Sequence, residues 1–394
     1  MMSNRKITET IPVAPLKIIA MKNCTALGEK IDQCIVEARG AMLESNETLP
    51  AFLGYDKSTY LVSYQIPRFG TGEAKAVINE TIRGSDLFLI ADVMNYTNHY
   101  TMFGEDSIKS PDDHFQDLKR VIAAAKISKV KRVNVILPFL YEGRQHHRDK
   151  LESLDCALAL QELSDMGVEN IITFDAHDPR IQNAVPIRGF DNFYTSLQFI
   201  RELLFTEKDL LIDKDHLMVI SPDEGGMTRA VYYANVLGVE MGMFYKRRDY
   251  STIVDGRNPI VAHEFLGSSL EGKDVLIIDD IISSGESILD VAKELKKRKA
   301  GRVFIAATFG LFCNGLEKID EYYEAGYFDR IFTTNLIYNS EELLKRPYYR
   351  NVDLSRYLSL IVDTLNHDTS VNDIINPVSL IQELLESYRN RHNA

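Results

Sequence analysis

Short apolar runs alternate along this chain with segments of helical periodicity. Several of the runs are apolar nearly throughout, as expected for strands of a parallel sheet that is covered on both faces. The alternation of such strands with amphipathic helices predicts an α/β fold in which parallel sheets are flanked by helices. The predicted strands are Leu16–Ala20, Asp86–Ala91, Arg132–Pro138, Asn170–Asp175, Leu217–Ser221, Glu240–Phe244, Val275–Asp279, Arg302–Thr308 and Arg330–Thr333.

Apolar residues at helical spacing mark three predicted helices. The third follows Pro377, and we interpret it as a packing helix rather than one that binds a partner. The apolar stripes are Cys156, Ala159, Leu160 and Leu163; Ile288, Val291, Ala292 and Leu295; and Ile381, Leu384, Leu385 and Tyr388.

The distribution of strands predicts two α/β domains of similar size. The charged stretch Thr206–Asp215 is interpreted as the link between them. We therefore expect an N-terminal domain over 1–205, a C-terminal domain over 206–355 and a helical extension over 356–394. Two segments, Ala41–Ser58 and Met94–Asp113, read as irregular insertions.

Charge and cysteine content narrow the class of function. The 394 residues carry a net charge of −12, which argues against a nucleic-acid partner, since such proteins are usually basic. The four cysteines are widely separated, which argues against a zinc ribbon and fits free thiols in a reducing compartment. No run of about 20 apolar residues is present, so we expect a cytoplasmic protein with no membrane partner.

The segment VLIIDDIISSGES, from Val275 to Ser287, carries the strongest chemical signal. It predicts a buried strand, two adjacent acids, a turn of small residues and the start of a helix. Small residues let backbone N–H groups approach a phosphate, and the helix directs its positive end at it. The two acids at the strand end are suited to accept hydrogen bonds from sugar hydroxyls. An N-capping turn with a solvated acid pair remains the alternative.

Four further segments place chemically useful residues at predicted strand ends. Asp223 is a hard oxygen ligand suited to Mg²⁺, and two glycines follow it. His177 lies at the end of a buried strand, where a hydrogen bond to the backbone is the alternative to a ligand role. The adjacent His146 and His147 are expected to point apart, which disfavours a metal site there. The segments are YEGRQHHRDK, ITFDAHDPRIQNAV, VISPDEGGMTRA and FYKRRDYS.

These motifs, in this order, resemble those of the ribose-phosphate diphosphokinase (phosphoribosyl diphosphate synthase) family. The resemblance also includes FGTGE, from Phe69 to Glu73, and extends over roughly Leu16 to Leu354. It implies two phosphoribosyltransferase-like domains, each with a mostly parallel sheet flanked by helices. It further implies a homo-oligomer built from dimers, as in the hexamers of the family.

The resemblance also implies roles for individual residues. Mg²⁺ is the implied cofactor, and ATP and ribose 5-phosphate are the implied substrates. The assignments are Phe69, Glu73, Arg144, Gln145, Asp149 and His177 for ATP; Asp279, Asp280, Ser283, Ser284, Gly285 and Ser287 for ribose 5-phosphate; His177 and Asp223 for the metal; and Lys246 and Arg248 for catalysis.

The implied reaction transfers the diphosphoryl group of Mg–ATP to the anomeric hydroxyl of ribose 5-phosphate, giving 5-phosphoribosyl 1-diphosphate and AMP. A non-catalytic regulatory paralogue and a phosphoribosyltransferase are the alternatives. Several positions depart from the family pattern and point to an altered sugar, an altered nucleotide or lost catalysis. They are Thr71, His146, Glu152, Ser283 and Glu286.

Overall fold

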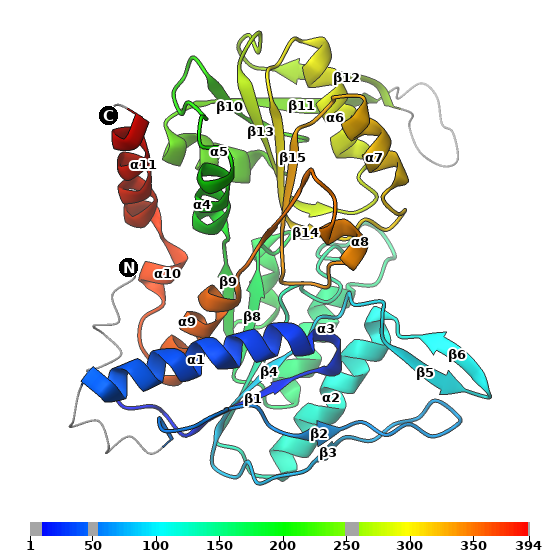
Figure 1. Cartoon of the computed structure of the whole chain (residues 1–394). Coiled ribbons are helices and arrows are strands. Elements are labelled where there is room, and N and C mark those ends of the chain that lie inside the picture. The colour runs from blue at the N-terminus through cyan, green and yellow to red at the C-terminus, as the bar shows by residue number, and fades with distance from the viewer. Residues whose placement is uncertain (1–9, 46–53, 249–259, 393–394) are drawn as a thin grey trace. The chain divides into compact units, whose positions relative to one another are not determined.

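Each of the two units into which the chain divides is built around one sheet (Figure 1). The computed structural model describes residues 10–45, 54–248 and 260–392. Unit 1 contains the chain up to Tyr194 together with Asn335–Tyr338 and Asp353–Asn376. Unit 2 contains Thr195–Thr334, Asn339–Val352 and the chain from Pro377 onward. The predicted α/β class is confirmed in both units.

The sheet of unit 1 has five described strands, all parallel, in the order β1-β4-β7-β8-β9. Beyond β1, the segment around Leu61 runs alongside Ile18 and extends the sheet by a short bridge. The strands are β1 (Leu16–Ala20), β4 (Asp86–Ile90), β7 (Arg132–Ile136), β8 (Asn170–Phe174) and β9 (Gly189–Phe193).

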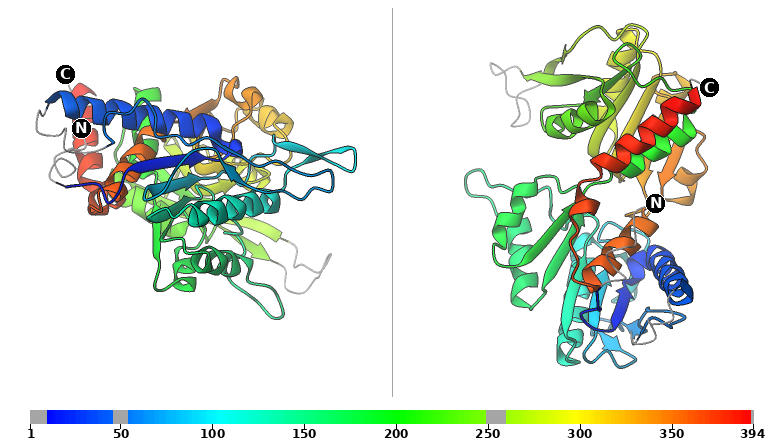
Figure 2. Two further views of the ribbon diagram at one scale, coloured as in Figure 1. Left: turned by 90° about the horizontal axis from the view of Figure 1, so that it is seen from below. Right: turned by 90° about the vertical axis from the view of Figure 1, so that its left-hand side faces the viewer.

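Helices cover both faces of this sheet. In Figures 1 and 2, α1 and α9 lie side by side over one face, and α2 and α3 lie over the other. A capping box at Ser110 and Asp113 begins α2. The helices of unit 1 are η2 (Lys22–Cys24), α1 (Thr25–Ser45), α2 (Pro111–Ile127), α3 (Asp155–Asp165), η4 (Pro179–Ala184), α9 (Ser355–Asn366) and α10 (Asn372–Ile375).

Two small antiparallel hairpins extend from unit 1. The first pairs β2 (Tyr64–Gln65) with β3 (Val77–Ile78), and the second pairs β5 (His99–Met102) with β6 (Glu105–Ile108). The second hairpin rests on the turn of the first, because the Phe103 N–H donates to the Gly70 carbonyl at 2.8 Å.

The sheet of unit 2 has seven described strands in the order β12-β11-β10-β13-β14-β15-β16. All neighbours are parallel except β11 and β12. The strands are β10 (Leu217–Ser221), β11 (Glu240–Arg248), β12 (Ile260–Leu266), β13 (Asp274–Ile282), β14 (Val303–Gly310), β15 (Arg330–Thr334) and β16 (Tyr349–Val352).

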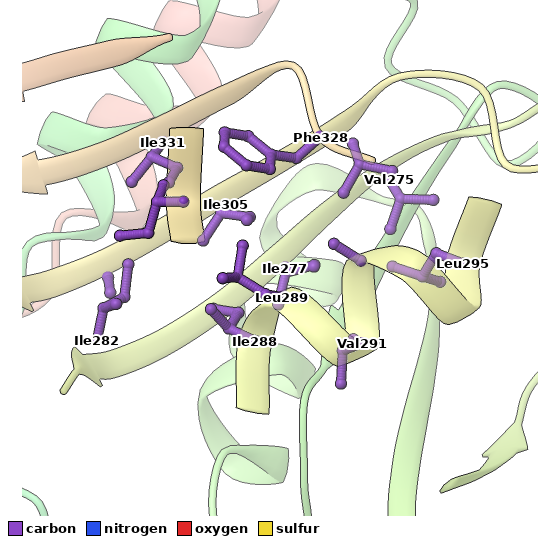
Figure 3. Close-up of a cluster of buried hydrophobic side chains, with 14 of the residues drawn as sticks. Val275, Ile277, Ile282, Ile288, Leu289, Val291, Leu295, Ile305, Phe328 and Ile331 are labelled. Carbon is purple, nitrogen blue, oxygen red and sulfur yellow. The ribbon is translucent and has the colours of Figure 1, made fainter. Parts of the chain in front are cut away.

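A hydrophobic core fixes the central strands of unit 2 to the helices after β13 and β14 (Figure 3). Ile282 at the end of β13 and Ile288 near the start of α6 are both buried in it. Elsewhere in unit 2, α11 runs beside α4 and α5 (Figure 2). The helices are α4 (Ser196–Thr206), α5 (Met227–Leu237), α6 (Glu286–Lys297), α7 (Glu317–Glu324), α8 (Glu341–Leu344) and α11 (Val378–His392).

The nine predicted strands are all present, and the three predicted apolar stripes lie on α3, α6 and α11. Ile381, Leu385 and Tyr388 of α11 are buried, as expected of a packing helix. The stretch predicted as an interdomain link lies inside unit 2, where Leu210 and Ile212 are buried. That interpretation was wrong because its charges are neutralised locally, with Glu207 paired to Arg302 at 3.3 Å.

The two predicted insertions are more regular than expected. Met94–Asp113 contains β5, β6 and the start of α2, so its reading as irregular was wrong. Ala41–Ser45 is the last turn of α1, and residues 46–53 lie outside the described part of the chain. The C-terminal stretch is divided, since α9 and α10 belong to unit 1 whereas α11 belongs to unit 2. Among the described residues, no helix is sufficiently long and apolar to cross a lipid bilayer.

Candidate active site

The two adjacent acids lie at the carboxyl end of β13, at the edge where parallel sheets usually bind ligands. Asp280 is 5% exposed, and its backbone N–H donates to Asp279 Oδ1 at 2.9 Å. Arg229 on α5 places its Nη1 4.0 Å from Asp279 Oδ1 and 3.8 Å from Asp280 Oδ1. Burial and the neighbouring Asp280 raise the pKa of Asp279 well above its usual range, although Arg229 opposes the shift. The pair therefore retains a proton more readily than two separate carboxyls would.

The loop after β13 is held between two buried anchors, Ile282 and Ile288, which Figure 3 shows in the core. Its backbone is also tied to the segment after β14. The Leu311 N–H donates to the Ile282 carbonyl at 2.8 Å, and the Cys313 N–H donates to the Ser283 carbonyl at 3.0 Å. Gly285 has φ +86°, a conformation that favours glycine, and α6 starts at the next residue. The result is a fixed turn of small residues leading into a helix N-terminus.

Glu286 departs from the family pattern, and its carboxylate pairs with Lys318. Glu286 Oε1 lies 3.0 Å from Lys318 Nζ on α7, and the Glu286 side chain is exposed. The acid therefore has a local cation to offset its charge beside the loop.

The turn after β10 places Asp223 at the same edge of the sheet as the acid pair, because β10 and β13 are parallel neighbours. Asp223 Oδ1 accepts a hydrogen bond from the Gly226 N–H at 3.2 Å, and the Ser221 hydroxyl donates to the Asp223 carbonyl at 2.6 Å. A Cβ at position 226 would lie 2.9 Å from Ser221 Oγ, so glycine there leaves room for that hydroxyl. The backbone thus presents Asp223 in a fixed turn.

β11 carries the two predicted catalytic cations to this edge as well. It is parallel to β10 and runs to Arg248, four residues past its predicted end, because β12 pairs with it. In the backbone register, Lys246 lies opposite His263. The side chains of Lys246 and Arg248 are outside the described part of the structure. The topology therefore brings the backbone of Lys246 to the edge that holds Asp223 and the acid pair.

In unit 1, the loop after β7 meets the end of β8 through a cluster of imidazoles. The rings of His146 and His177 have centroids 5.2 Å apart, and His146 Nε2 lies 3.5 Å from Asp178 Oδ2. These contacts bring the loop of Arg144, Gln145 and Asp149 beside His177. The Gln145 amide donates to the Ser153 carbonyl at 2.9 Å, and Arg144 is exposed.

The adjacent histidines of that loop point toward each other, contrary to the expectation from sequence. His147 Nδ1 lies 3.0 Å from His146 Nε2. Burial lowers the pKa of His146, and the nearby His177 and His147 add to this, while Asp178 opposes it. The shift in pKa favours the neutral form of the His146 imidazole. Glu152, another residue that departs from the family pattern, accepts a hydrogen bond from the Asp149 N–H at 3.2 Å.

Phe69 and Glu73 lie on the turn between β2 and β3, a different part of unit 1 from the histidine cluster. The Phe69 side chain is 57% exposed, and the Phe69 N–H donates to the Glu73 carbonyl at 2.8 Å. Thr71, another departure from the family pattern, donates its hydroxyl to Glu73 Oε2 at 2.9 Å. The Glu73 carboxylate therefore has a local partner within the turn.

Comparison with known proteins identifies the family. The model of the N-terminal domain of ribose phosphate pyrophosphokinase matches residues 16–167, and the phosphoribosyl transferase domain model matches residues 191–343. The chain belongs to the ribose-phosphate pyrophosphokinase family. The first match covers β1, β4 and β7 of the unit 1 sheet, and the second covers β10 to β15 of the unit 2 sheet.

Curated relatives agree with this family. A ribose-phosphate pyrophosphokinase of Chlorobaculum tepidum is 26% identical over 372 residues, covering 94% of this chain and 98% of the relative. One from Vibrio parahaemolyticus is 27% identical over 317 residues, covering 79% of this chain and 90% of the relative. The phosphoribosylpyrophosphate synthetase structure from Mycobacterium smegmatis has a TM-score of 0.69 at 18% identity and covers 90% of this chain and 99% of that chain. This last likeness establishes the shared fold.

Membership of the pyrophosphokinase family implies a divalent cation. The described residues supply some, but not all, of the ligands that such a cation needs. Within the described residues, no group of three or more His, Cys, Asp or Glu side chains is arranged to hold a metal ion. Mg²⁺ is commonly held by one or two carboxylates together with substrate phosphates and water. Asp223 supplies such a carboxylate in unit 2, and His177 belongs to unit 1. The donor chemistry therefore fits a cation that arrives with its nucleotide.

One site residue was missed from the sequence. Arg229 lies in the segment VISPDEGGMTRA and has no role among the sequence-based assignments, but in the structure its guanidinium faces the Asp279–Asp280 pair. Its position three residues after Gly226, on the first turn of α5, was the available signal. A cation on that turn faces the neighbouring strand end because α5 packs against β10 and β13.

Proposed function

We propose that this chain transfers the diphosphoryl group of Mg–ATP to the anomeric hydroxyl of ribose 5-phosphate, giving 5-phosphoribosyl 1-diphosphate and AMP. The observation that carries the proposal is the arrangement at one edge of the unit 2 sheet. The Asp279–Asp280 pair, Arg229 and the turn into α6 lie together there. This is a site for a molecule that has both hydroxyls and a phosphate.

The bond changes define what the residues must do. The anomeric oxygen forms a bond to the β-phosphorus and loses its proton, while the bond from that phosphorus to the α-phosphate oxygen breaks and AMP leaves. Such transfers depend mainly on positioning and on charge stabilisation. Mg²⁺, when bound, would neutralise phosphate charge, and we assign Asp223 and His177 to hold it.

We assign the sugar phosphate to the turn formed by Ser283, Ser284, Gly285 and Ser287. The backbone N–H groups there and the N-terminus of α6 favour an anion. The Asp279–Asp280 pair would accept hydrogen bonds from the ribose hydroxyls. Retention of a proton by the pair limits the negative charge that an incoming phosphate meets.

We assign binding of the nucleotide to residues of unit 1, and stabilisation of the transferred diphosphoryl group to residues of β11. Arg144, Gln145 and Asp149 lie on the loop that the His146–His177 contact holds beside the end of β8. Lys246 and Arg248 would stabilise the charge on the phosphoryl group in flight. A homo-oligomer is part of the proposal, and the 57% exposure of Phe69 is consistent with a nucleotide contact completed outside the single chain.

The test is direct. Purified protein is incubated with MgATP and ribose 5-phosphate, and AMP and 5-phosphoribosyl 1-diphosphate are followed together; equimolar appearance of the two is expected. Release of inorganic pyrophosphate on addition of a nucleobase and 5-phosphoribosyl 1-diphosphate would instead identify a phosphoribosyltransferase. Binding of both substrates with no AMP formed would identify a non-catalytic regulatory paralogue.

Asp280→Asn is expected to lower kcat/KM for ribose 5-phosphate by about 10- to 100-fold. The substitution keeps the shape of the side chain but removes its charge, and hydrogen bonds to charged groups contribute about 1.5–3 kcal/mol. Steady-state kinetics with each substrate varied in turn would measure the effect, with the KM for ATP expected to change little. Asp290→Asn, which alters an exposed acid of α6, is the matched control. If the two variants had the same kcat/KM for ribose 5-phosphate, the assignment of Asp280 to the sugar site would be wrong.

A further inference from the structure

Unit 1 contains a cavity of about 650 Å³ that none of the residues assigned above lines. It opens at the carboxyl end of β1, between the start of α1, the segment leading into β2 and the β5–β6 hairpin. Its volume is in the range of small-molecule sites. Asn98, His99, Tyr100 and Lys109 of its wall come from Met94–Asp113, the segment interpreted above as an insertion.

Two buried nitrogen donors on the wall have no hydrogen-bond partner among the described residues, namely Asn23 Nδ2 and Arg68 Nε. Asn23 is 4% exposed and the Arg68 side chain is 10% exposed. The Asn23 amide is oriented by its other contact, since Oδ1 accepts from the Asp92 N–H at 3.3 Å. A buried donor without a partner costs about 1–3 kcal/mol. Both atoms are covered by neighbouring protein atoms, so a ligand would satisfy them only after the two side chains turn toward the cavity.

Positive charge exceeds negative charge on one side of the cavity. Three cations share the buried Asp117 carboxylate: Arg68 at 2.9 Å and Lys109 at 2.7 Å, which line the cavity, and Arg120 at 2.6 Å, which does not. Burial raises the pKa of Asp117, but Lys109 and Arg68 more than offset this and hold it below its usual range. Asp117 is therefore ionised and cancels one of the three charges, and Asp113 Oδ1, 3.9 Å from Arg68 Nη1, offsets part of a second. The exposed Lys22 adds a further cation at the rim, opposed by Glu29.

The inserted hairpin fixes the geometry of this cluster. The Arg68 guanidinium carbon lies 4.2 Å from the centre of the Tyr100 ring, and Arg68 Nη1 donates to the Gly72 carbonyl at 2.8 Å. Arg68 is thus held by a ring, a carbonyl and a carboxylate at once. Apolar side chains, including Leu61, Val62, Ile66 and Pro67, form another part of the wall.

We propose that this cavity binds a small organic oxyanion, a molecule with a phosphate or carboxylate group on an apolar body. Its charged oxygens accept hydrogen bonds from Arg68 Nε and Asn23 Nδ2 and are attracted by Lys22. Its apolar body lies against the segment Leu61–Pro67. The site is separate from the proposed diphosphoryl transfer and does not depend on it.

The test uses phenyl phosphate, inorganic phosphate and benzoate as probes, with binding measured by isothermal titration calorimetry. Lys22→Glu is expected to weaken phenyl phosphate binding at least about fivefold, and Glu29→Gln is expected to strengthen it, because the two changes alter the rim charge in opposite directions. Lys129→Glu, the same charge change on an exposed lysine that does not line the cavity, should have no effect. Comparison of phenyl phosphate with benzoate shows which oxyanion is preferred.

Asp280→Asn separates this site from the sugar site. Binding at the cavity should be unchanged in that variant, whereas binding at the proposed sugar site should be reduced. Hydrogen exchange should show protection of the segments around Asn23 and Arg68 when phenyl phosphate is present. The proposal is wrong if no probe binds at millimolar concentration. It is also wrong if the affinity is unchanged in Lys22→Glu and Glu29→Gln but falls in Asp280→Asn. Circular dichroism melts of the variants would establish that each is folded.

Discussion

Lys246→Ala is expected to reduce turnover by about 10²- to 10³-fold, the usual effect of losing one group that stabilises transition-state charge. The backbone of Lys246 lies on β11, at the sheet edge that also holds Asp223 and the Asp279–Asp280 pair. A cation there would act mainly on the phosphoryl group in flight. Single-turnover measurements of AMP formation would give the rate, and the KM values should change far less than kcat.

Lys299→Ala is the matched control for this experiment. Lys299 follows α6, lies away from the carboxyl edge of the sheet and pairs with Glu271 at 2.8 Å on the surface. Its replacement should leave turnover within about twofold, since exposed ion pairs contribute little. Turnover near the parent value in Lys246→Ala would refute its role in charge stabilisation.

Arg39→Met is expected to lower the free energy of unfolding of unit 1 by about 3–5 kcal/mol, because it leaves a buried carboxylate without its cation. Arg39 is 1% exposed. Its Nε and Nη2 donate to Asp363 Oδ1 at 2.8 and 2.6 Å, and Nη2 also donates to Asn366 Oδ1 at 2.7 Å. Its guanidinium lies over the rings of Tyr55 and Tyr60. Urea denaturation followed by circular dichroism, with hydrogen exchange in α1, would measure the loss.

Two further variants test this explanation. Lys30→Met removes an exposed partner of Asp353 in the same unit and should cost less than about 1 kcal/mol. Combining Arg39→Met with Asp363→Leu should recover most of the lost stability, because no unpaired buried charge remains. If the double variant were as unstable as Arg39→Met alone, the unpaired carboxylate would not be the cause.

Local patterns in the sequence were sufficient for most of the sheet framework. Strands such as Leu16–Ala20 and Leu217–Ser221 were predicted to the residue, because each has four apolar residues out of five, as expected of a strand in a covered sheet. Of the strands in the two sheets, β9, β12 and β16 were missed. Gly189–Phe193 includes an acid and an amide, and Tyr349–Val352 includes an arginine and an amide, so neither has an apolar run. Their pairing with β8 and β15 depends on tertiary position and not on local pattern.

Contacts between distant parts of the sequence could not be predicted. The partner of Glu286 is Lys318, 32 positions later, and no spacing rule connects them. The position of α9 could not be predicted for the same reason. Its apolar stripe is visible in the sequence, but nothing in the sequence indicates that it packs in unit 1. The small-residue turn after β13 was predictable because its chemistry lies within one continuous segment.

The return of residues 353–376 to unit 1 has a consequence for biosynthesis. Arg39 leaves the ribosome more than 300 residues before Asp363. The buried cation of α1 therefore has no ion-pair partner until most of the chain has been synthesised. Domains that are continuous in sequence can fold in order during translation, but this one completes only after the strands of the other unit have been made. The nascent N-terminal half is therefore expected to remain open to proteases and chaperones until translation is nearly finished.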